Sequence, residues 1–396
     1  MTFLTSCRAG PDQPTRPEPP SPNAQRSLSP ERRLKVPSLY NAAFSVVLCQ
    51  LIRHWPTGLS ALLPRASLFF KDLQMAGPLH CEQGQQREEA MIVPIAALVT
   101  PSCQFQFTST DGLAIACARW DARGPVRGVV QIAHGMGEHI GRYGGLIEVL
   151  VESGLIVYGN DHRGHGRTAP YPQAFGDFGE GGFRLLAEDI FHLTLIAKKE
   201  NPGKPLILLG HSMGSFAAQL YAIDHSRDIA GLALSGSGAL DGLARVARSA
   251  HRGQDNILNQ AFQPARTPFD WLSRDTSVVD AFMSDPLCFA TLQPLSNESF
   301  LAAASILADP ASLRKIRSDL PIYLLSGSDD PVGQRLEGLR ILIERYRAVG
   351  VQNISHDFYP GGRHEMLNEM NRAEVRANLL RWISSVLERH ISSEAS

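Results

Sequence analysis

The stretch that most constrains this chain is residues 206–214, where an apolar run leads into Gly-His-Ser-Met-Gly. The apolar residues predict a buried strand, and the residues after Gly214 have the pattern of a helix. So sharp a turn leaves no room for Cβ atoms at its flanks, which explains Gly210 and Gly214. It would lift the Ser212 hydroxyl above the sheet edge, over helix N–H groups that favour a negatively charged oxygen. The stretch therefore predicts a nucleophilic serine; the alternative is a serine in a purely structural turn.

Strands and helices are expected to alternate along the chain from residue 104 onward. Two runs of alternating apolar residues on either side of Thr110-Asp111-Gly112 predict a β-hairpin. Further strands are expected at residues 128–133, 155–159, 206–209, 231–235, 322–325 and 354–359, and helices at residues 143–152, 183–199, 216–223, 334–349 and 374–391. This alternation predicts an α/β fold, with a mostly parallel central sheet and helices on both faces.

The chain has 396 residues, which fits one large domain with an extension. Residues 1 to about 35 are rich in proline, serine and arginine, and residues 53–103 show no consistent period. We expect this N-terminal extension to be disordered or weakly ordered, and the folded domain to span residues 104–396. An apolar run at residues 39–52 is too short to cross a bilayer, and it leaves open a helix that docks on the domain or on a membrane surface.

The alternation breaks at about residues 239–307, where a helix-rich segment separates two expected strands. We interpret this segment as a cap inserted above the sheet edge from which Ser212 emerges. Its large apolar side chains are candidates to bind an apolar substrate, although packing of the cap on the sheet would explain part of them. The candidates are Phe262, Phe269, Trp271, Phe282, Met283 and Phe289.

Composition excludes several classes of function. The formal net charge is -1, so no basic field recruits nucleic acid. The six cysteines show no metal-binding spacing, and we interpret them as reduced thiols of a cytoplasmic protein. The histidines His134, His139, His162 and His165 follow two different strands and form no pair four residues apart on a helix. We therefore expect hydrogen bonding that holds the loops, and neither a metal nor a cofactor.

A serine nucleophile needs a base, and the base needs a carboxylate that fixes its tautomer. The loop after the expected strand 322–325 offers Asp329 and Asp330, and Pro331 would stiffen the backbone at Asp330. The loop after the last expected strand offers His364. His356 falls within that strand and is the weaker candidate for the base.

The tetrahedral intermediate needs two N–H donors for its oxyanion. We expect one from Met213, the residue after the nucleophile, and the other from Met136, in the loop after the strand that ends before His134. Both are backbone groups, so this role does not dictate the side chains at these positions.

Several motifs resemble those of the monoacylglycerol lipases and lysophospholipase-like hydrolases, a serine aminopeptidase-like group of the α/β-hydrolase superfamily. They are HGMGEHIGRY at residues 134–143, DHRGHG at 161–166, GHSMG at 210–214, GSDD at 327–330 and RHE at 363–365, with the cap segments FDWLSRD at 269–275 and DPLC at 285–288. The resemblance implies the α/β-hydrolase fold with an inserted helical cap. It also implies a triad of Ser212, Asp330 and His364.

The resemblance further implies an acylglycerol or lysophospholipid ester as the substrate. We therefore expect a serine hydrolase that cleaves a fatty-acyl ester through an acyl-enzyme, without a cofactor or metal. A general carboxylesterase or an acyltransferase is the alternative within enzymes, and a ligand-binding protein without catalysis is the alternative of another class. We expect a cytoplasmic protein, with transient contact to a membrane surface left open and no nucleic-acid partner; the oligomeric state stays unknown.

Overall fold

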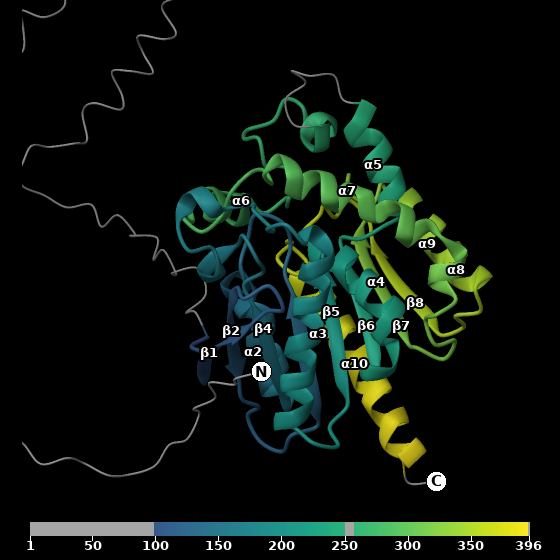
Figure 1. The fold of residues 1–396 in the computed structure, drawn as a ribbon. Coiled ribbons are helices and arrows are strands. Elements are labelled where there is room, and N and C mark those ends of the chain that lie inside the picture. The colour runs from purple at the N-terminus through teal and green to yellow at the C-terminus, as the bar shows by residue number, and fades with distance from the viewer. Residues whose placement is uncertain (1–98, 250–256, 395–396) are drawn as a thin grey trace, which may run out of the picture. The chain divides into compact units, whose positions relative to one another are not determined.

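The computed structural model describes residues 99–249 and 257–394 (Figure 1). Residues 1–98, which make up most of the expected N-terminal extension and include the apolar run at residues 39–52, lie outside the described residues. The strands that follow begin at Cys103, close to the start predicted for the folded domain.

A sheet of eight strands forms the centre of the domain, in the order β1-β2-β4-β3-β5-β6-β7-β8. The hairpin strands β1 and β2 are antiparallel to each other, and β2 is antiparallel to β4. All other neighbours are parallel. The strands are β1 (Cys103–Thr108), β2 (Ala114–Trp120), β3 (Gly128–Ala133), β4 (Leu155–Asn160), β5 (Leu206–His211), β6 (Gly231–Ser235), β7 (Ile322–Gly327) and β8 (Ile354–Tyr359).

Burial explains why the central strands have continuous apolar sequences. Every residue of β3, β4, β5, β6 and β7 is buried, as expected for parallel strands covered on both faces. The edge strands β1 and β8 instead mix buried and exposed positions. The mostly parallel sheet expected from the sequence is therefore confirmed.

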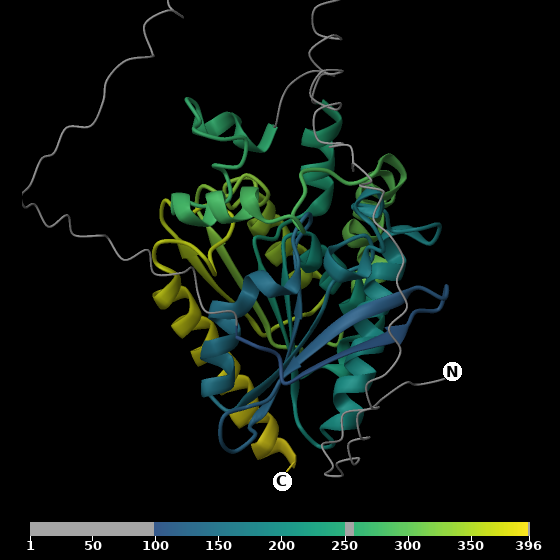
Figure 2. The ribbon, with the colours of Figure 1, turned by 90° about the vertical axis from the view of Figure 1, so that its left-hand side faces the viewer.

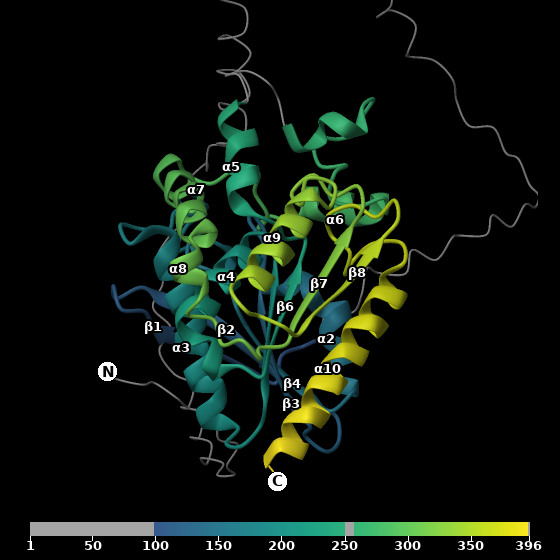
Figure 3. The ribbon, with the colours of Figure 1, turned by 90° about the vertical axis from the view of Figure 1, so that its right-hand side faces the viewer.

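Helices cover both faces of the sheet. One apolar core includes residues of α3, α4 and α9, and a second core on the other face includes residues of α2 and α10 (Figures 2 and 3). The helices outside the cap are α2 (Gly144–Glu152), α3 (Gly182–Glu200), α4 (Met213–His225), α9 (Glu337–Ala348) and α10 (Arg372–Glu394), with short 3-10 helices η2 (Ile140–Tyr143), η3 (Gly166–Thr168), η4 (Pro172–Ala174) and η5 (Ser226–Asp228). No helix in this described part of the chain is long and apolar enough to cross a bilayer.

The segment between β6 and β7 forms a helical layer over one end of the sheet (Figure 1). Its described helices are α5 (Leu240–Ser249), η6 (Ile257–Phe262), α6 (Thr276–Ser284), α7 (Pro294–Ala308) and α8 (Pro310–Leu313). The apolar core under α3 and α4 continues into this layer through Trp271, Leu272 and Phe282. The cap predicted at residues 239–307 thus corresponds to a layer that packs on the sheet.

Two expectations are wrong in detail. The helix predicted to start at Gln334 starts at Glu337, because Gln334, Arg335 and Leu336 all have positive φ angles (51°, 53° and 74°) that a right-handed helix does not allow. Cys103 is disulfide-bonded, so the prediction that all cysteines are reduced is wrong there. Cys117 and Cys288 are free thiols.

Candidate active site

Ser212 lies in the turn between β5 and α4, where its backbone has a φ of 52°. A residue with a side chain rarely adopts this conformation, which costs on the order of 1–3 kcal/mol. The flanking glycines allow the turn. A Cβ at Gly214 would lie 2.2 Å from the carbonyl oxygen of Ala133, and one at Gly210 would lie 2.6 Å from that of Gly214. The Ser212 N–H donates to the carbonyl of Ser235 over 2.9 Å, which anchors the turn to β6.

His364 and Asp330 form a buried pair. The Nδ1 atom of His364 donates to Oδ1 of Asp330 over 2.9 Å, and the two side chains are 2% and 0% exposed. Asp330 also accepts the N–H of Val332 over 2.9 Å and the hydroxyl of Ser326 over 3.3 Å. Burial disfavours the charged imidazole, but the Asp330 carboxylate outweighs this effect and raises the pKa of His364 above its ordinary value.

The two weaker candidates for these roles lie elsewhere. Asp329 turns its carboxylate to the hydroxyl of the preceding serine, 3.2 Å away. His356 is exposed in β8 and stacks on Phe358, with the ring centroids 4.5 Å apart. Of the predicted acids and bases, the structure therefore brings together Asp330 and His364.

Ser212 and His364 line the same pocket. Because Nδ1 of His364 faces Asp330, its Nε2 atom is the nitrogen left for the serine. Among the described residues, no hydrogen bond joins that nitrogen to the Ser212 hydroxyl. In free enzymes this contact often tightens only when substrate binds. Trp271 packs against the imidazole ring of His364, with the two ring centroids 4.9 Å apart. The backbone carbonyl of Trp271 also accepts the backbone N–H of His364 over 3.4 Å.

Two N–H groups beside Ser212 have no acceptor among the described residues, those of Met136 and Met213. Met213 is the first residue of α4, where helix N–H groups lack partners within the helix. Met136 lines the pocket together with Ser212. The N–H of Gly135, by contrast, donates to the Glu138 carboxylate over 2.6 Å. The unpaired donors are the two predicted for the oxyanion, and that role stays a prediction.

Arg142 connects the loop after β3 to the loop that carries His364. Its guanidinium donates to Glu138 over 2.6 Å and makes two bonds of 2.9 Å to Glu365. Glu138 also accepts the hydroxyl of Tyr143 over 2.6 Å. Burial opposes ionisation of Glu138, but the charge of Arg142 together with nearby histidines and the hydrogen bond from Tyr143 outweighs burial and lowers the pKa of this carboxyl. These side chains had no predicted role, although each lies in one of the family-like motifs.

The walls of the pocket beside Ser212 are largely aromatic. Four residues of the predicted cap set line it, namely Phe269, Trp271, Phe282 and Phe289. The rings of Phe269 and Phe282 lie 5.0 Å apart. The interior volume is about 40 Å³, which holds only a few water molecules. A long apolar chain therefore enters this pocket only if the cap moves.

The other two residues predicted to bind substrate lie outside the lining of this pocket. Met283 is 50% exposed, because α6 turns Val279 and Phe282 inward and the next position outward. Phe262 packs under the guanidinium of Arg363, whose central carbon lies 4.4 Å from the ring centroid. Neither Phe262 nor Met283 lines the pocket in this arrangement of the cap, and their role in substrate binding stays a prediction.

The four histidines noted in the sequence separate into two groups. His134 donates from Nδ1 to the carbonyl of the next residue over 2.8 Å, and its Nε2 accepts the N–H of His162 over 2.9 Å. Burial lowers the pKa of His134, His162 and His165, so these rings are neutral at pH 7. They tie the loop after β3 to the loop after β4. His139 lies apart, with Nε2 2.9 Å from the carboxylate of Asp285.

Known proteins resemble this chain in sequence and in fold. A family model described as serine aminopeptidase, S33, matches residues 124–371. The monoacylglycerol lipase of Mycolicibacterium smegmatis is 31% identical over 72% of this chain and 98% of the lipase. The monoglyceride lipase of Homo sapiens is 29% identical over 70% of this chain and 88% of that protein. A thermostable carboxyl esterase from Bacillus coagulans, solved in complex with glycerol, has a TM-score of 0.65 and 30% identity, over 72% of this chain and 98% of the esterase.

Proposed function

We propose that this chain, which belongs to the serine aminopeptidase S33 family and has the α/β-hydrolase fold, cleaves monoacylglycerols with Ser212 as the nucleophile. The chain is a carboxylic ester hydrolase, as its relatives indicate. The observation that carries the finer proposal is the 2.9 Å hydrogen bond between His364 and Asp330, beside a pocket that Ser212 also lines.

In the first half of the reaction the Ser212 oxygen attacks the ester carbonyl carbon, and Nε2 of His364 takes the hydroxyl proton. Asp330 keeps the other ring proton on Nδ1 and stabilises the imidazolium that forms. The bond from carbon to the glycerol oxygen then breaks, and His364 gives its proton to that oxygen. Glycerol leaves, and the fatty acyl group stays on Ser212 as an ester.

In the second half a water molecule replaces glycerol. His364 takes one of its protons while the water oxygen attacks the acyl carbon, and the proton returns to Ser212 as the fatty acid leaves. In both halves the negative carbonyl oxygen accepts the N–H groups of Met136 and Met213. Each such donor contributes about 3 kcal/mol of transition-state stabilisation in comparable sites.

The pocket favours a substrate with a single acyl chain. Each buried methylene contributes about 0.8 kcal/mol, and the aromatic residues Phe269, Phe282 and Phe289 offer the surface for it. Because the interior volume is only about 40 Å³, one acyl chain needs a smaller movement of the cap than three chains would, which favours monoacylglycerols over triacylglycerols. The names of the relatives, a monoacylglycerol lipase and a monoglyceride lipase, support the same choice.

The place of action stays a prediction. A cytoplasmic location was inferred from composition, and the disulfide at Cys103 weakens it because disulfides persist mainly in oxidising compartments. A monoacylglycerol is itself a membrane lipid, so transient contact with a membrane surface is part of the proposal.

A panel of esters tests the proposed substrate. We expect kcat/KM on p-nitrophenyl esters to rise from acetate to octanoate, because each added methylene finds apolar surface. We also expect 1-monoacylglycerols to be cleaved faster than triacylglycerols and faster than lysophospholipids of the same chain length.

Each other outcome of this panel points to a named alternative. A flat chain-length profile would leave a general carboxylesterase, the activity in the name of the Bacillus coagulans protein. Faster cleavage of lysophospholipids would move the substrate to that class. Preference for a peptide over every ester would favour an aminopeptidase, and transfer of the acyl group to an added alcohol in place of water would favour an acyltransferase.

A further inference from the structure

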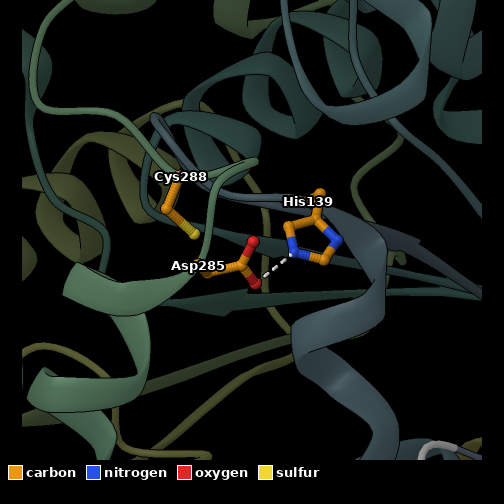
Figure 4. Close-up of side chains that lie close together, drawn as sticks. All are labelled: His139, Asp285 and Cys288. Atoms are coloured by element: carbon orange, nitrogen blue, oxygen red, sulfur yellow. Dashed lines mark hydrogen bonds and ion pairs between the residues drawn. The ribbon is translucent and has the colours of Figure 1, made fainter. Parts of the chain in front are cut away.

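Three metal-binding side chains of different chemistry meet beside the pocket but outside its lining: His139, Asp285 and Cys288 (Figure 4). Their donor atoms lie within 4.8 Å of one another, and all three residues are partly buried. They come from two separate segments, the loop after β3 and the loop after α6. We propose that these three side chains bind a zinc ion, which holds the cap against the loop after β3.

The loop after α6 is already shaped to present two ligands on one side. The carbonyl of Asp285 accepts the N–H of Cys288 over 3.0 Å, and its Oδ1 atom accepts the N–H of Leu287 over 2.9 Å. Pro286 restricts the backbone between them. A turn closed in this way brings the side chains at its first and last positions together. It also leaves Oδ2 of Asp285 directed at His139, 2.9 Å away.

Imidazole nitrogen, thiolate sulfur and carboxylate oxygen are the ligands that zinc prefers, and water completes a tetrahedral site. Without metal, Nδ1 of His139 accepts the N–H of Gly141 over 3.2 Å, so Nε2 carries the ring proton and donates to Asp285. On binding, the ring proton moves to Nδ1, the long bond from Gly141 is lost and Nε2 coordinates zinc. The Cys288 thiol releases its proton to solvent, and zinc gives up bound water.

The charges around Cys288 favour a cation. The charged groups near Cys288 include the guanidinium of Arg142 and the carboxylates of Asp285, Glu138 and Glu365. A divalent cation would offset this excess of negative charge and stabilise the thiolate.

The three side chains flank the place where the cap meets the loop after β3. Phe289, the residue after Cys288, donates its N–H to the carbonyl of Gly137 over 3.0 Å. The backbones touch so closely that a Cβ at Gly137 would lie 2.1 Å from the carbonyl oxygen of Phe289. Phe289 lines the pocket, and Gly137 follows Met136, which lines it too. An ion bound here would therefore resist movement of the cap away from the pocket.

If zinc restrains the cap, it should also affect turnover. This effect on turnover rests on the proposed function, but the binding of zinc is independent of it. A pocket of about 40 Å³ admits a long acyl chain only when the cap moves, but an acetyl group needs little extra room. Zinc should therefore slow the cleavage of p-nitrophenyl octanoate by a larger factor than that of p-nitrophenyl acetate.

Binding is tested first, with the full-length chain freed of metal by a chelator and kept reduced with a phosphine. Zn²⁺ is titrated by calorimetry, and Co²⁺ is added as a probe whose thiolate charge-transfer absorption reports a sulfur ligand. The variants are Cys288→Ser and His139→Ala. The matched control is His225→Ala, which removes a histidine that also faces an aspartate, Asp228, at 3.9 Å.

We expect the wild type and His225→Ala to bind Zn²⁺ equally and to show the cobalt–thiolate band. Cys288→Ser and His139→Ala each lose one ligand, so the Kd for Zn²⁺ should rise by at least about tenfold in both. In Cys288→Ser the cobalt–thiolate band should also disappear. Unchanged Zn²⁺ affinity in Cys288→Ser, or a cobalt–thiolate band that survives that change, would overturn the site.

The turnover of p-nitrophenyl octanoate and p-nitrophenyl acetate is then measured with and without Zn²⁺. The rate of each protein with Zn²⁺ is divided by its own metal-free rate. Stronger inhibition with octanoate than with acetate in the wild type, and loss of that difference in Cys288→Ser, would support the tether. Equal inhibition of both esters would refute it. If the chain cleaved no ester at all, the proposed function would fail, and the calorimetric comparison would still decide whether the zinc site exists.

Discussion

Replacing Asp330 with asparagine is expected to lower kcat by about four orders of magnitude and to leave the fold intact. His364 donates from Nδ1 to this carboxylate over 2.9 Å, and both side chains are buried, so water does not replace the lost partner. An asparagine amide can turn its NH₂ group to Nδ1, and the ring proton then moves to Nε2, where the serine needs a lone pair. A loss of about 10⁴-fold corresponds to about 5.5 kcal/mol of transition-state stabilisation.

The same change should shift the pH dependence in a defined direction. The base works as neutral His364, so kcat/KM rises as pH passes upward through its pKa. In the wild type the Asp330 carboxylate outweighs burial and raises that pKa above the ordinary value of about 6.5. In Asp330→Asn burial acts without the carboxylate. The midpoint of the residual activity should therefore move to lower pH.

The neighbouring acid provides the matched control. Asp329→Asn changes the same functional group one residue away, but this carboxylate bonds to a serine hydroxyl and not to His364. We expect it to keep most of the activity and the wild-type pH midpoint. Steady-state kinetics on one ester across pH, with circular dichroism to verify folding, measures both variants. A larger loss in Asp329→Asn than in Asp330→Asn would refute this account of the acid.

Two further pairs of variants test the surroundings of the site. Arg142→Met leaves the buried Glu138 without its partner and should lower the free energy of unfolding by about 3–5 kcal/mol in urea titrations. Arg184→Met, at an ion pair whose arginine is 80% exposed, should change this free energy by less than about 1 kcal/mol. Similar losses in both variants would show that Arg142 does not stabilise the two loops that it connects. Phe282→Ala should enlarge the pocket and raise the ratio of octanoate to acetate turnover, whereas Met283→Ala should not. A change of that ratio in Met283→Ala alone would show that the cap faces the pocket differently in solution.

Much of the fold was predictable because its signals are local. The central strands are buried on both faces, and the sequence shows this directly as continuous apolar runs. The turn at Ser212 was predictable because only glycine fits where two backbone segments lie so close that a Cβ would clash. Gly210 and Gly214 both occupy such positions. His364 and Asp330 could be selected because each follows a strand at the same edge of the sheet.

The features that sequence analysis missed depend on contacts between distant segments. Arg142 and Glu365 meet across 223 positions of the chain, so no spacing relates them. Which side of α6 faces the pocket depends on the packing of the cap, so the exposure of Met283 could not be predicted from the sequence. The start of α9 was predicted too early because propensity does not reveal that Gln334 and its two successors adopt left-handed backbone conformations.

Covalent labelling of the nucleophile tests directly whether Ser212 attacks the substrate. The full-length protein is treated with a fluorophosphonate, digested, and the modified residue identified by mass spectrometry. The account predicts one modified peptide, labelled at Ser212, and no labelling in a folded Ser212→Ala variant that also loses its esterase activity. A label on another serine, or labelling and turnover that persist in Ser212→Ala, would contradict it.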